Sequence, residues 1–325
     1  MNWILKTGVA TLLALTPLSA LAQAPLPTFG APTDPAAAEP EGESQAGGDI
    51  AFGAYQRGFY ITAFREAMKR VTANSKDAAA MTLIGEIYRE GYAVKQDTGE
   101  ASHWYRLASG LGDREAAFEL GVLLLNGAPG VPKDRAAAKA QFELAAQKNE
   151  ANALYNLGVM ALDSEGGAKP DFAKAAEYFR RSAEAGDEDG SYSYGVMLRE
   201  GRGVPLDIGE SAHWLKRAAD AGVIAGQVEY GIMLFNGVGV EKNEAGAAKI
   251  FLRAAARNNP IAQNRLAHLY LTGRGVPRDL VEAATWNRFA KTAGLDDPEL
   301  DAATANLTPE ENEKVNELVR RQAAF

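Results

Sequence analysis

The sequence predicts an all-α fold in which short helix–loop–helix units repeat and stack into a solenoid. One observation is a recurring corner, because GRGVPLD at 201–207 returns as GRGVPRD at 273–279. The other is a constant period, since related corners close at steps of 37, 37, 36, 36 and 36 residues. The closing residues are Asp97, Asp134, Asp171, Asp207, Asn243 and Asp279. A period of this length indicates a stacked repeat architecture.

Residues 1–22 are expected to be a cleaved signal peptide. Met1–Lys6 carries one positive charge, Thr7–Leu21 is largely apolar, and Ala20–Ala22 fits the small-x-small cleavage rule. An uncleaved anchor helix is the alternative, although the segment is short for a membrane span. No later stretch of 18 apolar residues follows, so we expect no membrane span in the mature chain. Export from a Gram-negative bacterium would make the mature protein periplasmic.

Residues 23–48, QAPLPTFGAPTDPAAAEPEGESQAGG, are expected to be a disordered linker. They hold five prolines and almost no large apolar side chains. A segment of this composition buries too little apolar surface to offset the entropy of ordering. Ordered structure is expected from Asp49 onward, with residues 49–77 forming a degenerate helix pair that caps the N-terminus. A solenoid requires such terminal caps.

Each repeat is expected to contain two helices joined by the recurring corner. In the fourth copy the first helix, built around Gly195, stops at Gly201, and Gly203 and Pro205 keep the following chain out of a helix. Asp207 then caps the second helix, because its carboxylate accepts bonds from the free N–H groups there. The sequence repeats because this corner repeats.

Two columns of side chains recur at fixed positions in the repeats. The first helices repeat a glycine, at Gly85, Gly121, Gly158, Gly195 and Gly231, with Ala267 in the sixth copy. Glycine within a helix costs about 1 kcal/mol against alanine, so its repetition predicts close approach of a neighbouring helix. The second helices repeat large side chains, at Trp104, Gln141, Tyr178, Trp214, Ile250 and Trp286, and beside them at Tyr105, Phe142, Phe179, Leu215, Phe251 and Asn287. We interpret these columns as core packing rather than as a ligand stack.

The repeat pattern A-x-x-x-L-G-x-x-Y-x-x-G-x-G-V-x-x-D-x-x-x-A-x-x-W-Y-x-x-A-A-x-x-G resembles the Sel1-like repeat of exported bacterial proteins, a relative of the tetratricopeptide repeat. The resemblance covers residues 78–294 in six copies and implies a right-handed α-solenoid. The third copy, LDSEGGAKPD, departs most from the corner. Residues 295–325 are expected to form one capping helix, which opens with a capping box at Thr308, Pro309 and Glu311.

The composition argues against several classes of function. A formal net charge of −8 disfavours binding to nucleic acid, and the absence of cysteine excludes disulfide scaffolds and thiol nucleophiles. His103 and His213 lie three repeats apart and cannot share a site, and no nucleophile pattern lies near His268. Zinc-protease, nucleophile-elbow and phosphate-loop motifs are missing. We therefore expect a protein that is not an enzyme, with no catalytic, metal-binding or cofactor-binding residues and no cofactor.

The resemblance to tetratricopeptide repeats implies that the first helices line a concave groove in which a partner lies. Candidate partner-binding residues stand three before, one after and four after the repeat glycine: Phe118, Val122, Leu125, Tyr155, Val159, Leu162, Tyr192, Arg199, Ile232, Phe235 and Leu271. The last of these positions is usually polar in the family. At this position the sequence has four apolar residues, which would form an apolar strip if exposed: Leu125, Leu162, Phe235 and Leu271. They could instead face the adjacent repeat.

These expectations favour a non-catalytic adaptor or scaffold of the cell envelope that binds a peptide or helix of another envelope protein. The resemblance also implies an alternative, a periplasmic regulator that inhibits a membrane sensor kinase. A third reading of a different class is a cell-wall hydrolase. The sequence leaves the partner and the oligomeric state open.

Overall fold

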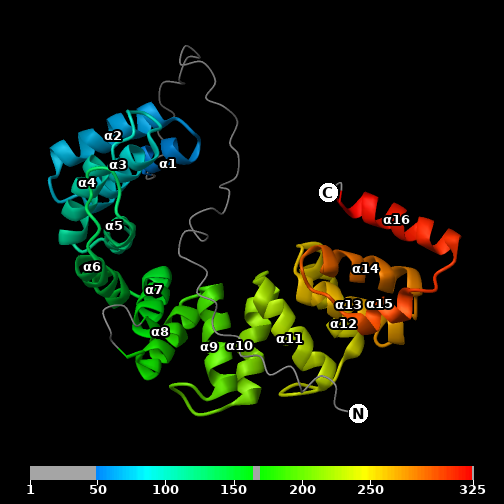
Figure 1. Cartoon of the computed structure of the whole chain (residues 1–325). Coiled ribbons are helices and arrows are strands. Elements are labelled where there is room, and N and C mark those ends of the chain that lie inside the picture. The colour runs from blue at the N-terminus through cyan, green and yellow to red at the C-terminus, as the bar shows by residue number, and fades with distance from the viewer. Residues whose placement is uncertain (1–48, 164–168, 324–325) are drawn as a thin grey trace. The chain divides into compact units, whose positions relative to one another are not determined.

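The computed structural model describes residues 49–163 and 169–323, and this part of the chain contains sixteen α-helices and no strand (Figure 1). The helices are α1 Ile50–Gln56, α2 Tyr60–Ala73, α3 Ala78–Glu90, α4 Thr98–Gly110, α5 Arg114–Asn126, α6 Arg135–Gln147, α7 Ala151–Leu162, α8 Phe172–Glu184, α9 Glu188–Glu200, α10 Ile208–Asp220, α11 Ile224–Asn236, α12 Glu244–Ala256, α13 Pro260–Thr272, α14 Leu280–Thr292, α15 Pro298–Thr304 and α16 Pro309–Ala323. The predicted signal peptide and linker lie outside the described residues.

Helices α3 to α14 form six antiparallel pairs, which we number repeat 1 (α3 and α4) to repeat 6 (α13 and α14). Each helix packs against the next along the chain, both within a repeat and between repeats. The core therefore extends as a continuous line of small clusters along the stack, as expected of a repeat protein. The predicted all-α solenoid is confirmed. No helix in the described ranges is long and apolar enough to cross a membrane.

The recurring corner forms as predicted. In repeat 4, Gly201 ends α9 in the left-handed conformation, with φ of 64°. The backbone N–H of Asp207 donates to the carbonyl of Leu198 at 3.0 Å, and its carboxylate accepts from the N–H of Glu210 at 2.9 Å. All six predicted closing residues cap second helices in this way: Asp97, Asp134, Asp171, Asp207, Asn243 and Asp279. Part of the divergent third corner, residues 164–168, lies outside the described ranges.

The repeated glycine is explained by a ring or branched side chain from the second helix of the same repeat. A Cβ on Gly85 would stand 2.7 Å from the ring of Tyr105, and one on Gly158 would stand 2.6 Å from that of Phe179. These distances are too short for any real Cβ, so only glycine lets the two helices approach this closely. In repeat 6 both residues change together, because Ala267 replaces the glycine and the smaller Asn287 replaces the ring. The predicted close approach is confirmed.

The helices at the N-terminal end of the stack agree with the sequence prediction, whereas those at the C-terminal end agree only in part. The predicted N-terminal pair is α1 and α2, with Asp49 capping α1. The capping box of α16 is also present, since the N–H of Thr308 donates to Glu311 at 2.8 Å. However, residues 295–325 contain two helices, not the single helix predicted. The additional α15 has only seven residues, and its one buried side chain, Leu300, packs on the preceding repeat. Its start signal was present in the sequence, because Asp297 caps the helix and Pro298 follows at the first helical position, but the sequence reasoning did not use it.

Candidate partner-binding surface

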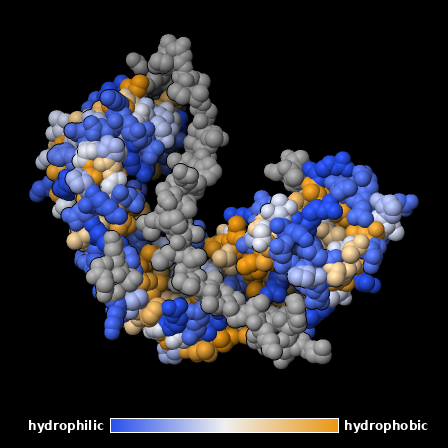
Figure 2. Space-filling model, in the orientation of Figure 1, coloured by the Kyte–Doolittle hydropathy of each residue, from blue (hydrophilic) through white to orange (hydrophobic). Residues whose placement is uncertain are grey.

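Most of the predicted partner-binding residues lie on the first helices and are only partly exposed. Nine of them are half-buried: Phe118, Val122, Tyr155, Val159, Leu162, Tyr192, Arg199, Ile232 and Leu271. The other two, Leu125 and Phe235, are 7% and 9% exposed and belong to the core. Figure 2 shows hydrophobic residues gathered over α11, the first helix of repeat 5, whose sequence is IAGQVEYGIMLFN.

Leu125 and Phe235 are buried because their position faces the next repeat. Leu125 packs in one cluster with Leu154 and Leu157 of α7, the first helix of repeat 3. The ring of Phe235 lies under the guanidinium of Arg274, 4.1 Å from its carbon. The exposed apolar strip considered from the sequence is therefore not continuous. For these two residues the structure has the alternative arrangement, in which they face the adjacent repeat.

Arginine at this same position makes ion pairs across the junction between repeats. In repeat 1, Arg89 contacts Glu119 of the next first helix at 3.4 Å, as well as Glu86 at 2.6 Å. In repeat 4, Arg199 bonds Glu229 of the next first helix. Arg199 is thus already neutralised within the chain, which weakens its predicted role as a contact for acidic groups of a partner.

An aromatic row remains at the surface of repeats 2 to 4. It consists of Phe118, Tyr155 and Tyr192, one from each first helix and each half-buried. Each of the first two rings also leans on the second helix of its own repeat, with centroids 6.0 Å apart for Phe118 and Phe142 and 5.5 Å for Tyr155 and Phe179. Tyr192 packs on the core cluster of repeats 4 and 5, so each of the three rings has one side against the core.

A second row of polar side chains stands one helical turn before these rings, and the sequence reasoning missed it. It consists of Glu115, Asn152 and Asp189, each six residues before the repeat glycine. Partial burial and the neighbouring Glu188 raise the pKa of Asp189. Glu115 is more exposed, and desolvation together with Asp113 and other nearby carboxylates raises its pKa. This polar row could have been recognised from the sequence, because the position six residues before the repeat glycine is polar in three of the six copies.

The junction between repeats 1 and 2 contains a partly buried network of one cation and three carboxylates. Glu86 accepts hydrogen bonds from the hydroxyl of Tyr105 at 2.8 Å and from Arg89. Arg89 also contacts Glu90 at 3.0 Å and Glu119 at 3.4 Å. Burial outweighs the attraction to Arg89 and raises the pKa of Glu119 to about 7. This carboxyl therefore titrates near neutral pH.

The histidines do not assemble a reactive site. His103 and His213 are exposed on second helices and lie edge-on to Trp104 and Trp214. The Nε2 atom of His268 lies 2.8 Å from Asp297, just before α15. Within residues 49–163 and 169–323, no group of three or more histidine, aspartate or glutamate side chains is arranged to hold a metal ion.

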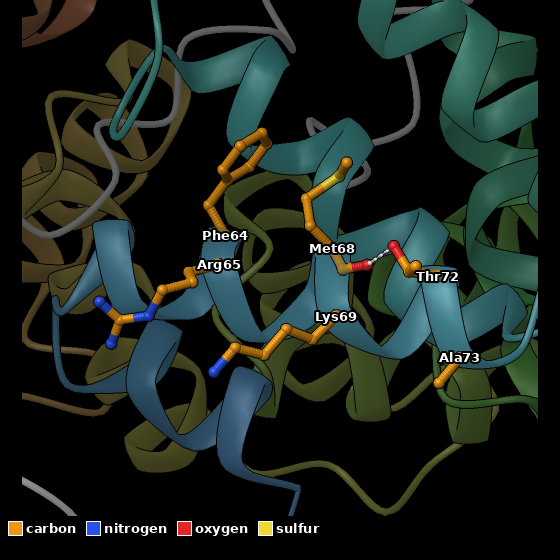
Figure 3. A pocket seen from close by; sticks show the side chains of 6 residues that line it. All are labelled: Phe64, Arg65, Met68, Lys69, Thr72 and Ala73. Carbon is orange, nitrogen blue, oxygen red and sulfur yellow. Dashed lines mark hydrogen bonds between the residues drawn. The ribbon is translucent and has the colours of Figure 1, made fainter.

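A hollow of about 620 Å³ lies on α2 and is lined by Phe64, Arg65, Met68, Lys69, Thr72 and Ala73 (Figure 3). Lys69 and Arg65 both contact Glu66, at 2.8 and 3.5 Å. The Thr72 hydroxyl donates to the carbonyl of Met68 at 2.8 Å. The polar groups of the hollow are therefore engaged within α2, and these six residues do not form an acid–base or nucleophilic arrangement.

Comparisons with known proteins agree with the repeat architecture. A family model described as Sel1 repeat matches residues 78–113, 114–150, 151–187, 189–223, 224–259 and 260–294. A solved Sel1 repeat protein from Oxalobacter formigenes is 25% identical with a TM-score of 0.61, over 74% of this chain and 94% of that one. A protective antigen of uropathogenic Escherichia coli strains with an SLR fold is 24% identical with a TM-score of 0.57, over 84% and 67%. No curated protein matches the chain.

Proposed function

Because the chain belongs to the Sel1 repeat family, we propose that it is a non-catalytic adaptor or scaffold of the cell envelope. Sel1 repeats generally mediate protein–protein interaction. Our proposal adds the place of binding: the first-helix surface of the central repeats holds a peptide or helix of another envelope protein.

The aromatic row of Phe118, Tyr155 and Tyr192 carries this proposal. These large rings are only half-buried, although they stand at equivalent positions of three successive repeats. Aromatic side chains contribute much apolar contact area at little cost in conformational entropy, so they are enriched among the residues that dominate binding energy. A stack of helices also gives such a row a fixed spacing, which suits an elongated partner.

The assignment to the envelope is supported by the N-terminal sequence alone. The charged start, the apolar run and the Ala20–Ala22 triplet have the features of a signal peptide. We propose that the chain is exported and that it acts in the periplasm if the source is a Gram-negative bacterium. Fractionation of cells that express the full chain, followed by mass determination of the mature N-terminus, tests this part directly.

Site-specific photo-crosslinking in living cells tests the binding surface. A photo-reactive amino acid at Val159, beside the aromatic row, is compared with the same amino acid at Leu144, which is 45% exposed on the second helix α6. We expect a discrete adduct with one envelope protein from position 159 and none from position 144. Adducts from both positions or from neither would contradict the proposed surface. The identity of the captured protein distinguishes a scaffold from a regulator of a sensor kinase.

A further inference from the structure

The aromatic row and the polar row coincide only in the central part of the stack. At the polar position the described repeats 1, 5 and 6 have Ala79, Ala225 and Ile261, none of which offers an acceptor. At the aromatic position the same repeats have Thr82, Val228 and Asn264. Ring and acceptor therefore occur together, three residues apart on one helix, in repeats 2, 3 and 4 alone among the six. Residues three apart on a helix are neighbours on its surface.

The two carboxylates of the polar row make no ion pair with another described residue, although each lies in the first turn of its helix, where the free N–H groups favour negative charge. Asp189 is half-buried and has the carboxylates of Glu188 and Asp187 as charged neighbours. Glu115 is exposed and lies near Asp113, Glu86 and Glu150, with Arg114 as a cationic neighbour. That guanidinium approaches the carbonyl of Lys148 at 3.5 Å. A carboxylate that lacks a counter-ion gains free energy when a cation reaches it, and the gain is larger for the half-buried Asp189 than for the exposed Glu115.

We infer that the partner segment bound by repeats 2 to 4 is an extended basic peptide, with lysine or arginine side chains directed at Glu115 and Asp189. This inference rests on the proposed function and adds the chemistry of the partner. The rings of Phe118, Tyr155 and Tyr192 suit the same ligand, because long basic side chains pack their alkyl stems on aromatic surfaces and place the cation near the ring. The amide of Asn152 offers a further acceptor between the two carboxylates.

The geometry of the stack sets the spacing of the basic residues. Packed helices lie about 8–10 Å apart, and an extended chain advances about 3.3 Å per residue. Successive first helices pack mainly on the second helix between them, so this spacing is a lower bound and one repeat corresponds to about three residues of an extended peptide or more. Because Glu115 and Asp189 are two repeats apart, the two basic side chains should be separated by about six residues or more.

Repeat 6, at the far end of the stack, carries a cation on its first helix, whereas repeats 2 and 4 carry the carboxylates of the polar row. Arg265 on α13 is half-buried and has no hydrogen bond or ion pair to another described residue. Burial lowers its pKa, although Asp297 and Glu229 oppose this. A basic segment laid along the first helices would meet favourable charge at repeats 2 to 4, and at repeat 6 it would meet Arg265, whose charge Asp297 and Glu229 offset only in part.

Selection from a random 12-residue peptide library on the full chain tests this inference. We expect enriched peptides to carry lysine or arginine pairs about six residues apart or more. Fluorescence anisotropy with an enriched peptide should show Kd rising about tenfold or more for the Glu115→Gln, Asp189→Asn double variant, since hydrogen bonds to charged groups are lost. The control is Glu143→Gln, Glu177→Gln, which removes two carboxylates from second helices and should change Kd less than about twofold. Affinity should also fall as salt is added.

Two outcomes overturn the inference and remain distinguishable. Enrichment of neutral or acidic peptides, or unchanged affinity in the double variant, shows that the partner is not basic. If such binding is still weakened by Tyr192→Ala, the proposed surface stands and only the charge assignment is wrong. If no selected peptide depends on Tyr192, or none is enriched, the surface itself is wrong and both proposals fail. Circular dichroism of each variant confirms that it is folded.

Discussion

Gly121 lies so close to Phe142 that a Cβ on the glycine would stand 2.6 Å from Cε1 of the ring. The two residues belong to the two helices of repeat 2, and the ring is fully buried. The same relationship joins Gly85 to Tyr105 and Gly231 to Phe251, so it sets the separation of the paired helices along the stack.

Gly121→Ala should destabilise the protein although alanine favours helix. The gain in helix propensity is about 1 kcal/mol, whereas overpacking against a fixed ring costs about 1–3 kcal/mol. We expect a net loss of up to about 2 kcal/mol in urea denaturation. The control is Gly53→Ala in α1, where a Cβ would meet nothing within 4 Å. That change should be neutral or stabilising. Equal stability changes in the two variants would contradict the packing account.

Asp207→Ala should weaken the corner of repeat 4. The carboxylate accepts from the N–H of Glu210 at 2.9 Å, and removal of such a cap costs about 0.5–2 kcal/mol. Asp207→Asn should cost much less, because asparagine caps helices about as well as aspartate. Hydrogen exchange of the first turn of α10 is the measurement, and faster exchange confined to the alanine variant is expected.

Leu125→Ala should cost about 2–5 kcal/mol of stability, because it leaves a cavity in the junction between repeats 2 and 3. Leu144→Ala, on the exposed side of α6, should change stability by less than about 0.5 kcal/mol. Thermal melting of both variants checks this. Similar melting temperatures would show that Leu125 is a surface residue and would return it to the candidates for partner binding.

Glu119 should make stability depend on pH. Burial raises its pKa from 4.5 to about 7, so the folded state holds the proton more tightly than the unfolded state does. Between pH 4.5 and about 7 the folded chain binds more protons than the unfolded chain. The contribution of Glu119 to the free energy of unfolding therefore falls as pH rises through this range.

Glu119→Gln removes this contribution, so the variant should gain stability relative to the parent as pH rises, by about 1 kcal/mol or more between pH 4.5 and pH 8. Urea denaturation at the two pH values measures it. Glu177→Gln, on the exposed side of α8, should show no such trend. A parent-to-variant difference that is independent of pH would contradict the assignment.

The sequence by itself determined the repeat period, the helix pairs, their corners and the close approach at the glycine column. These features follow from local chemistry. Asp207 caps α10 through its own carboxylate, and Gly201 ends α9 because glycine adopts positive φ freely. The covariation of Ala267 with Asn287 could also be read from the sequence, because the repeats align at a constant spacing.

Only the tertiary structure decided which side of each first helix is covered. Leu125 and Val122 lie three residues apart on α5, yet Leu125 packs into the core with α7 while Val122 is half-buried at its edge. This difference results from the packing of side chains at the junction between repeats 2 and 3, where Leu154 and Leu157 cover Leu125. The short helix α15 is a mixed case, because Asp297 and Pro298 mark its start in the sequence, whereas its packing on α13 and α14 is visible only in the structure.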